Sequence, residues 1–391
     1  MLFFRISVSR KLRYQYFGQI AQLQLFLMKL KEIIQSLEEL APPSYQEHYD
    51  NSGLIVGNRE MEITSAIISL DATEAVVEEA ISMGANLIIS HHPIIFSGLK
   101  KLIGQNYVER TVIQAIKNNI AIYAIHTNLD SVANGVSAKM CEKLGLENCK
   151  ILKPKSDDLL KLVFFVPTAH AEITRNAVFE AGAGHIGNYD ACSFNLTGAG
   201  TFRAGNLANP YVGEIGKMHT EQEVRIETIF PKHLQSKVIR ALISAHPYEE
   251  VAYDIYALAN SNPQAGFGMI GFCKEEIDET FFLEKLKQIF ELKVVKHSPL
   301  LNKKIKKIAL CGGSGSFLLN NAISAGADIF ISGDFTYHQF FDGDSKILIA
   351  DIGHYESEQF TKNLIFDYLT KKFPTFAAQI SKTNTNPINY I

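Results

Sequence analysis

Histidine and carboxylate residues follow four of the strands that the sequence predicts. Two groups lie in the N-terminal part of the chain and two in the C-terminal part: His91 with His92, His126 with Asp130, Asp334 with His338, and His354 with Glu358. In open parallel sheets, ligands bind beyond the carboxyl ends of the strands. We therefore expect these side chains to converge on one cleft. Five of them are expected to bind a pair of divalent metal ions: His91, His92, Asp130, His354 and Glu358.

The donor types restrict the metal. Imidazole and carboxylate ligands without thiolates suit zinc, manganese, iron or nickel, and the sequence does not choose among them. His91 and His92 are adjacent and point in different directions, so both rings are used either by two metals or by one metal and one substrate contact. His354 and Glu358 are four residues apart and share one face of a helix that starts near Tyr355.

Each of these residues also has a purely structural interpretation. His91-His92-Pro93 has the composition of a turn, and Asp130 is a good helix cap. Acids at the start of a helix, such as Glu356, are favoured by the helix dipole. Only the convergence of all four strand ends favours the metal site over these alternatives.

Alternating strands and helices must position these residues. The pattern predicts strands at 67–70, 87–90 and 120–125, separated by helices that end near Gly84 and span about 106–119. Asp71 and Glu74 are spaced as a capping box for the first of these helices. Such alternation predicts βαβ units and a parallel sheet.

The C-terminal part repeats a segment of the N-terminal part. Residues 81–90 (ISMGANLIIS) match residues 323–332 (ISAGADIFIS) at most positions. The first copy is followed by His91 and His92, and the second by Gly333 and Asp334. We therefore predict two related α/β lobes that form one core, at residues 28–154 and 301–391.

Residues 155–300 are predicted to form a separate inserted domain. Two successive strand–helix–strand patterns occupy about 162–196 and 224–257. Two such halves predict an α+β ferredoxin-like fold. The Gly- and Asn-rich stretch 198–216 is expected to be a loop or hairpin that joins them.

Composition excludes several classes of protein. The chain has 391 residues, 47% of them hydrophobic, which is enough for more than one buried core. The net charge of −3 gives no argument for nucleic acid or an acidic membrane surface. Five widely spaced cysteines without a CxxC argue against a disulfide framework and for a cytoplasmic protein. No apolar run is long enough to span a membrane.

Two further segments allow alternative interpretations. Residues 1–27 contain basic residues and no acidic residue. We expect this segment to be dispensable, with Met28 as the true start of the protein. The alternative is that residues 1–27 form a targeting peptide. The Gly-rich stretch from Gly312 to Gly315 either cradles a phosphate on its backbone N–H groups or forms a tight turn.

From Met28 onward the chain resembles the GTP cyclohydrolase 1 type 2 homologues, also called NIF-three-like proteins. The motifs that carry the resemblance are Asp50-Asn51-Ser52-Gly53-Leu54-Ile55-Val56-Gly57, Ser90-His91-His92-Pro93, His126-Thr127-Asn128-Leu129-Asp130, Ser332-Gly333-Asp334 with His338, and Gly353-His354 with Glu358. Tyr49 stands where the family often has Trp. The resemblance implies two metals held by His91, His92, Asp130, His354 and Glu358, with Glu358 bridging. It further implies a hexameric ring and an inserted domain like PII or CutA proteins.

The resemblance leads to two hypotheses about function. The first is a dinuclear-metal hydrolase that acts on a nucleotide, such as GTP, with Asp334 and His338 as catalytic residues. The second is a non-catalytic regulatory or scaffold protein whose inserted domain senses a ligand. A proton-transfer group beside the metals distinguishes the two, because a catalyst needs one and a sensor does not.

Overall fold

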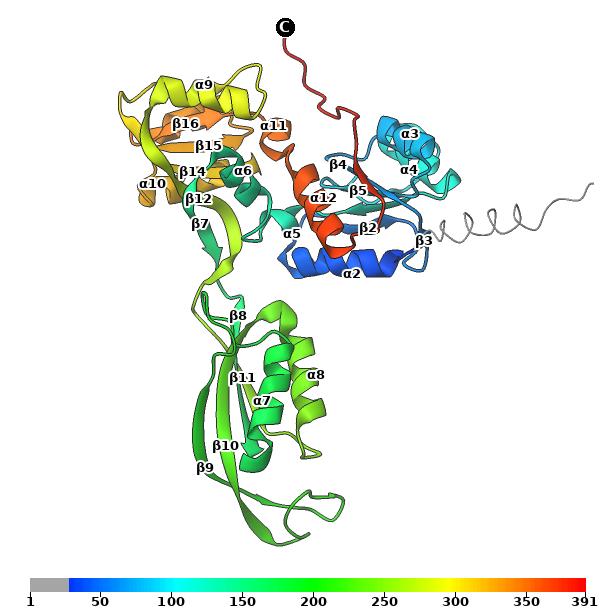
Figure 1. Ribbon diagram of the computed structural model, residues 1–391, viewed down its shortest axis with the longest axis vertical. Helices are drawn as coiled ribbons and strands as arrows, with labels where there is room; N and C mark the ends of the chain where they lie inside the picture. Colours follow the sequence, from blue (N-terminus) through cyan, green and yellow to red (C-terminus); the bar gives the residue numbers. More distant parts are fainter. Residues whose placement is uncertain (1–27) are drawn as a thin grey trace, which may run out of the picture. The chain divides into compact units, whose positions relative to one another are not determined.

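The computed structural model describes residues 28–391, and the expectation about residues 1–27 lies outside this range. The protein has a mixed α/β fold with several sheets (Figure 1). It divides into two compact units: residues up to Leu129 together with those from Glu358 onward, and residues Asp130–Ser357. No helix in the described part of the chain combines the length and the apolar character that crossing a bilayer requires.

A five-stranded sheet forms the centre of the first unit. Its order is β17 (Ala378–Ile380), β4 (Ala66–Ser69), β5 (Leu87–Ser90), β6 (Ala121–Ala124) and β2 (Gly53–Val56). The first four strands run parallel, and β2 is antiparallel to β6. The predicted parallel pairing of β4, β5 and β6 is therefore confirmed. The carboxyl ends of β5 and β6 meet at one edge of the sheet, just before His91 and His126.

Two helices cover one face of this sheet. Helix α3 (Glu74–Met83) and helix α4 (Tyr107–Lys117) share a hydrophobic core with β4, β5 and β6. The predicted capping box of α3 is wrong, because the N-cap is Thr73, whose side chain accepts a hydrogen bond from the Val76 amide. Asp71 is not used as a cap because its carboxylate binds a histidine ring elsewhere.

Helices from the two ends of the described chain lie side by side in the first unit. These are α2 (Leu30–Leu40) and α12 (Thr361–Lys372) (Figure 1). The Tyr368 hydroxyl lies 3.2 Å from the Ser36 hydroxyl and donates to the Ser36 carbonyl at 2.8 Å. Residues after Glu358 thus belong to the same unit as residues 28–129, and they bring Glu358 to the sheet.

A six-stranded sheet forms the centre of the second unit. Its order is β13 (Lys296–His297), β16 (Leu348–Asp351), β15 (Ile329–Gly333), β14 (Lys304–Ser314), β12 (Asn262–Asp278) and β7 (Glu147–Lys155). Strands β14, β15 and β16 are parallel, and the other pairs are antiparallel. Helices α6 (Val136–Leu144), α9 (Glu279–Ile289) and α10 (Leu319–Ser324) accompany this sheet.

The repeated sequence segments occupy matching places. Strands β5 and β15 each lie between two parallel neighbours. The turn before each strand contains a left-handed glycine, Gly84 with φ +68° and Gly326 with φ +69°. A Cβ on either glycine would meet nothing within 4 Å. The backbone conformation alone therefore favours glycine at both positions.

A separate four-stranded sheet lies between β7 and β12 in the sequence. Its order is β11 (Tyr253–Ala257), β8 (Leu159–Pro167), β10 (Met218–Pro231) and β9 (Phe194–Arg203), with all pairs antiparallel. Helices α7 (Ala171–Glu180) and α8 (Gln235–Ala245) share a hydrophobic core with it. Strands β9 and β10 pair as a hairpin, as predicted for the Gly-rich stretch. The sheet therefore has a core of its own.

We predict that residues 156–261 can be excised without unfolding the rest of the chain. Lys155 of β7 and Asn262 of β12 are paired, so a short turn can join them directly. The variant is expected to unfold cooperatively in circular dichroism, because the other sheets keep all their strands. Excising the whole predicted range 155–300 is the matched control. It should give insoluble protein because the predicted C-terminal boundary lies too far along the chain: the excision also removes α9 and β12, and β12 belongs to the six-stranded sheet. Loss of cooperative unfolding in the shorter excision would contradict the prediction.

Candidate metal centre

Three histidines of the first unit meet beyond the ends of two neighbouring strands. His91 and His92 directly follow β5, and His126 follows β6 after one residue. Each offers one ring nitrogen, and these three atoms all lie within 4.8 Å of one another. The ring centroids of His126 lie 5.3 Å from those of both His91 and His92. His91 is fully buried and His126 nearly so.

The Glu358 carboxylate lies against two of these rings. One oxygen, Oε2, is 3.0 Å from Nε2 of His92, and the other, Oε1, is 3.7 Å from Nε2 of His91. Glu358 is 3% exposed, so its charge is removed from water. A buried carboxylate requires a positive partner, and each oxygen here faces a different imidazole. A proton or a metal ion satisfies that requirement.

Hydrogen bonds fix the orientation of all three rings. Nδ1 of His91 lies 2.8 Å from the carbonyl of Ile125, which only accepts. Nδ1 of His92 lies 2.8 Å from Asp71, and Nδ1 of His126 lies 2.7 Å from Asp50. In each neutral ring Nδ1 therefore carries the hydrogen and Nε2 carries the lone pair. Carboxylate or carbonyl partners on the second nitrogen are typical of metal-binding histidines, so this donor set fits a divalent cation.

The electrostatics of the cluster reflect its buried charges. Burial by itself lowers the pKa of His92, but hydrogen bonds with Asp71 and Glu358 outweigh this and raise it to about 10. Burial raises the pKa of Asp50, yet hydrogen bonds from His126 and Thr127 bring it well below its usual range. Asp71 behaves similarly, with its pKa lowered mainly by His92. In protein without metal, the raised pKa of His92 thus favours a protonated ring at the place where the donor set fits a cation.

Two other predicted ligands belong to the second unit. Asp130 is the last residue of α5 (Thr127–Asp130), and His354 is the first residue of α11 (His354–Glu358). His354 and Glu358 are four positions apart in this helix, which places both on one helical face as the spacing predicted. Their participation with His91 and His92 in metal binding remains a prediction.

Asp334 has a specific contact in the second unit. It follows β15 with a left-handed backbone (φ +59°), and its Oδ2 lies 2.7 Å from Nδ1 of His354. This repeats the arrangement of Asp71 with His92. The contact favours a role for Asp334 in orienting His354, and its catalytic role stays a prediction.

His338 lies in an exposed 3-10 helix, η5 (Tyr337–Gly343). Its ring packs edge-on against Tyr337, with centroids 5.2 Å apart. Its accessibility is compatible with proton transfer, which also stays a prediction.

Three residues of the cluster escaped assignment from the sequence. His126 follows a predicted strand but is not among the predicted ligands. Asp50 carries no prediction beyond its place in a motif, and the spacing of Asp71 predicts a helix cap instead. Asp71 and His126 could have been found from their positions in the sequence, because both come just after a strand end, as the predicted ligands do.

Comparison with known proteins identifies the family of this chain. A family model described as Duf34/NIF3 (NGG1p interacting factor 3) matches residues 28–387. The chain belongs to the Duf34/NIF3 family.

Relatives of this Duf34/NIF3 chain span nearly its full length. It is 38% identical to a GTP cyclohydrolase 1 type 2 homolog from Halalkalibacterium halodurans, over 92% of this chain and 98% of that one. A protein of the same name from Bacillus subtilis is 37% identical with the same coverage. The crystal structure of a Bacillus cereus protein related to NIF3 matches with a TM-score of 0.82 and 39% identity, over 93% of this chain and 100% of that one.

The Gly-rich stretch of this Duf34/NIF3 chain is not a phosphate cradle of the predicted kind. Strand β14 continues through Gly312 and Gly313 to Ser314. The amide of Gly313 donates to Ser357 Oγ and that of Gly315 to Ser332 Oγ, each at 2.9 Å. These N–H groups already donate to serine hydroxyls, and the stretch continues β14 into the 3-10 helix η4 (Ser316–Leu318) rather than forming the predicted tight turn.

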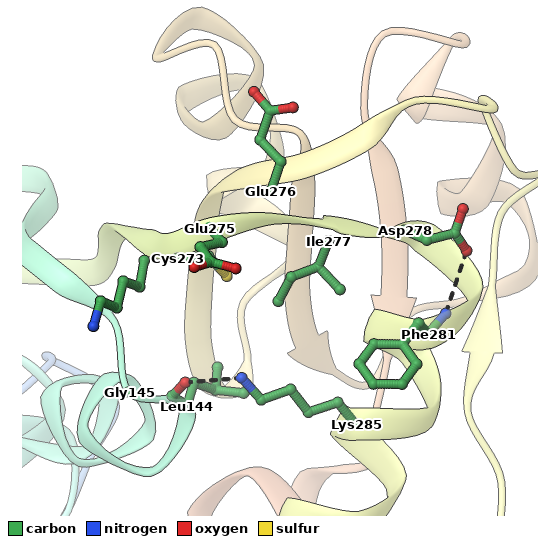
Figure 2. A pocket seen from close by; sticks show the side chains of 10 residues that line it. Leu144, Gly145, Cys273, Glu275, Glu276, Ile277, Asp278, Phe281 and Lys285 are labelled. Carbon is green, nitrogen blue, oxygen red and sulfur yellow. Dashed lines mark hydrogen bonds between the residues drawn. The ribbon is translucent and has the colours of Figure 1, made fainter.

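A cavity of about 700 Å³ in the second unit lies apart from these residues (Figure 2). It is lined by the end of α6, by an irregular part of β12 and by α9. Lys285 crosses it to reach the Leu144 carbonyl at 3.5 Å, and Asp278 caps α9. Two of its charged side chains, Lys285 and Asp278, thus already make hydrogen bonds within the fold. No residue of the histidine cluster lines this cavity.

The raised pKa of His92 predicts a pH dependence of stability. A folded pKa of about 10, above the unfolded value of about 6.5, stabilises metal-free protein fully below pH 6.5. This contribution is lost as pH rises from about 6.5 to about 10, with a slope of at most about 1.4 kcal/mol per pH unit. Urea unfolding of wild type and His92→Asn, both with chelator, measures it. Parallel pH profiles of the two proteins would refute the assignment.

Proposed function

We propose that this protein binds two divalent metal ions and uses them to hydrolyse a nucleotide. The observation that carries the proposal is the buried meeting of His91, His92 and Glu358, with each ring held through Nδ1. The relatives' name, GTP cyclohydrolase 1 type 2 homolog, makes GTP the first candidate substrate.

We assign the ligands as His91, His92, Asp130, His354 and Glu358. The two oxygens of Glu358 face two different rings, an arrangement suited to a carboxylate that bridges two ions. His354 shares a helical face with Glu358, and its Nδ1 is held by Asp334. His126 belongs to the same histidine cluster and is an additional candidate ligand. The donor set admits zinc, manganese, iron or nickel.

The chain's own groups would perform distinct tasks. Bound divalent ions supply a water whose pKa is lowered toward neutrality. Asp71, Asp50 and the Ile125 carbonyl hold the rings in the orientation that presents Nε2. Asp334 orients His354, and the exposed His338 ring passes a proton to the leaving group. Burial of His91 and Glu358 keeps bulk water from competing with these contacts.

We also propose the finer organisation of the fold. The order β11–β8–β10–β9 with two helices corresponds to a ferredoxin-like arrangement, which supports an inserted domain within the predicted range 155–300. The matching places of β5 and β15 support two related lobes. A cytoplasmic location and a hexameric assembly follow from composition and from the family resemblance respectively.

A second candidate is a non-catalytic scaffold that binds metal and senses a ligand. It is favoured by one observation: the four-stranded sheet has its own core and contributes no residue to the histidine cluster. The two candidates differ in whether metal-loaded protein turns over a nucleotide.

Metal content tests the ligand assignment. Purified protein is expected to hold close to two divalent ions per chain by elemental analysis. Glu358→Gln should hold less than half of the wild-type content, because a bridging carboxylate serves both ions. Glu78→Gln, on the exposed side of α3, is the matched control and should match wild type. Full metal content in Glu358→Gln would contradict the bridging role.

Turnover tests the chemistry. Metal-loaded wild type should hydrolyse GTP or another nucleotide slowly, as followed by product chromatography. His338→Ala should lower turnover by about 100-fold or more, the usual contribution of a general acid or base, with unchanged metal content.

Two controls accompany the turnover measurement. His185→Ala, another exposed histidine, should behave as wild type. The double variant His91→Ala, His92→Ala should be inactive. Equal rates in this variant and in wild type would assign the activity to a contaminant and favour the scaffold.

A further inference from the structure

The C-terminal segment, residues 381–391, begins beside the first unit and has no regular secondary structure (Figure 1). It follows β17, and its first amide, that of Ser381, donates to the Ile68 carbonyl at 2.8 Å. Glu79 of α3 then accepts from four groups of the segment: Ser381 Oγ at 2.6 Å, the Lys382 amide at 2.8 Å, Thr383 Oγ1 at 2.7 Å and the Thr383 amide at 3.3 Å. The segment is thus anchored before it reaches the metal centre.

The next threonine of the segment contacts the metal centre itself. Thr385 Oγ1 donates to Oδ2 of Asp71 at 2.5 Å. The other oxygen of Asp71, Oδ1, lies 2.8 Å from Nδ1 of His92, whose Nε2 lies 3.0 Å from Glu358. A continuous chain of hydrogen bonds therefore leads from the segment to a proposed metal ligand, entirely within the first unit.

We propose that Thr385 is a positioning residue of the metal centre, acting through Asp71 on His92. A carboxylate held at one oxygen can rotate about its side-chain bonds, whereas Thr385 and His92 together hold both oxygens of Asp71. The orientation of the Asp71 carboxylate, and with it that of the His92 ring, then depends on the docked segment. This inference rests on the metal-binding part of the proposed function and not on the hydrolysis.

Thermodynamic linkage gives the proposal a second consequence. If docking of residues 381–391 strengthens metal binding by a given factor, metal binding strengthens docking of the segment by the same factor. The C-terminal segment therefore becomes more protected when metal binds. A segment that only covers the surface would show no such dependence.

Zinc affinity of metal-free protein, measured against a competing chelator, tests the positioning role. Thr385→Val keeps the shape of the side chain and removes the hydroxyl, and it should weaken zinc binding about 3- to 10-fold, the equivalent of one hydrogen bond. Thr385→Ser should restore wild-type affinity. Thr383→Val is the matched control, because its hydroxyl contacts Glu79 and not Asp71, and it should bind zinc as wild type does.

A double-mutant cycle tests the route through Asp71. In an Asp71→Ala background, Thr385→Val should cause no further loss of zinc affinity, because its partner is gone. Additive losses would overturn the proposed route. Equal losses in Thr385→Val and Thr383→Val would also overturn it, since they would reflect general anchoring of the segment.

Hydrogen exchange of residues 381–391, with and without zinc, tests the linkage and needs no enzymatic activity. Zinc should slow exchange in wild type and Thr385→Ser, and this effect should shrink in Thr385→Val, with unchanged circular dichroism showing that the variant folds. If wild type and Thr385→Val bind zinc equally tightly, and zinc slows hydrogen exchange of residues 381–391 equally in both, the positioning role of Thr385 is overturned while the proposed metal binding stands. Wild type that binds no zinc overturns the proposed function and this inference together.

Discussion

A carboxylate buried among imidazole rings must be balanced by positive charge, and much of the first unit is arranged around this constraint. Glu358 is 3% exposed and lies against His91 and His92. Removing an unpaired carboxylate from water costs several kcal/mol. Hydrogen bonds with Asp71 and Glu358 raise the pKa of His92 to about 10, which favours a proton on this ring, and the same geometry suits a divalent ion. Because the requirement is electrostatic, it is satisfied only if the rings present the correct nitrogen.

Groups outside the histidine cluster determine which ring nitrogen faces Glu358. Asp50 precedes β2, Asp71 follows β4 and the Ile125 carbonyl follows β6, yet each engages Nδ1 of one ring. The carboxyl ends of the parallel strands β4 and β6 bring Asp71 and Ile125 to one edge of the sheet. The antiparallel strand β2 begins at the same edge, directly after the segment that contains Asp50. The sheet thus supplies both the inner donors and the groups that orient them, with few residues taken from long loops.

The side chains that meet at Glu358 were more predictable from the sequence than the groups that orient them. Strands β4, β5 and β6 were predictable because each is a short apolar run between helices, and His91 and His92 directly follow one of them. The partner of His92 was not predictable, because Asp71 also fits a helix cap and local patterns favour that interpretation. Thr385 gave no signal, since its contact joins residues 314 positions apart. Likewise, the Gly-rich stretch matched a phosphate-binding pattern, and only its hydrogen bonds to Ser332 and Ser357 exclude that role.

The two left-handed glycines bear on how this sequence tolerates change over evolutionary time. At Gly84 and Gly326 a side chain would meet no neighbouring atom, so only the backbone conformation opposes it, by about 1–2 kcal/mol. This backbone penalty does not depend on which residues stand at the end of the strand that follows each glycine. The positions that follow the two turns are under separate constraints. The first strand is followed by His91 and His92, whereas the second ends at Gly333, where a Cβ would lie 2.8 Å from the His354 amide nitrogen. The two segments thus share a backbone requirement in the turn and differ in the chemistry at the end of the strand.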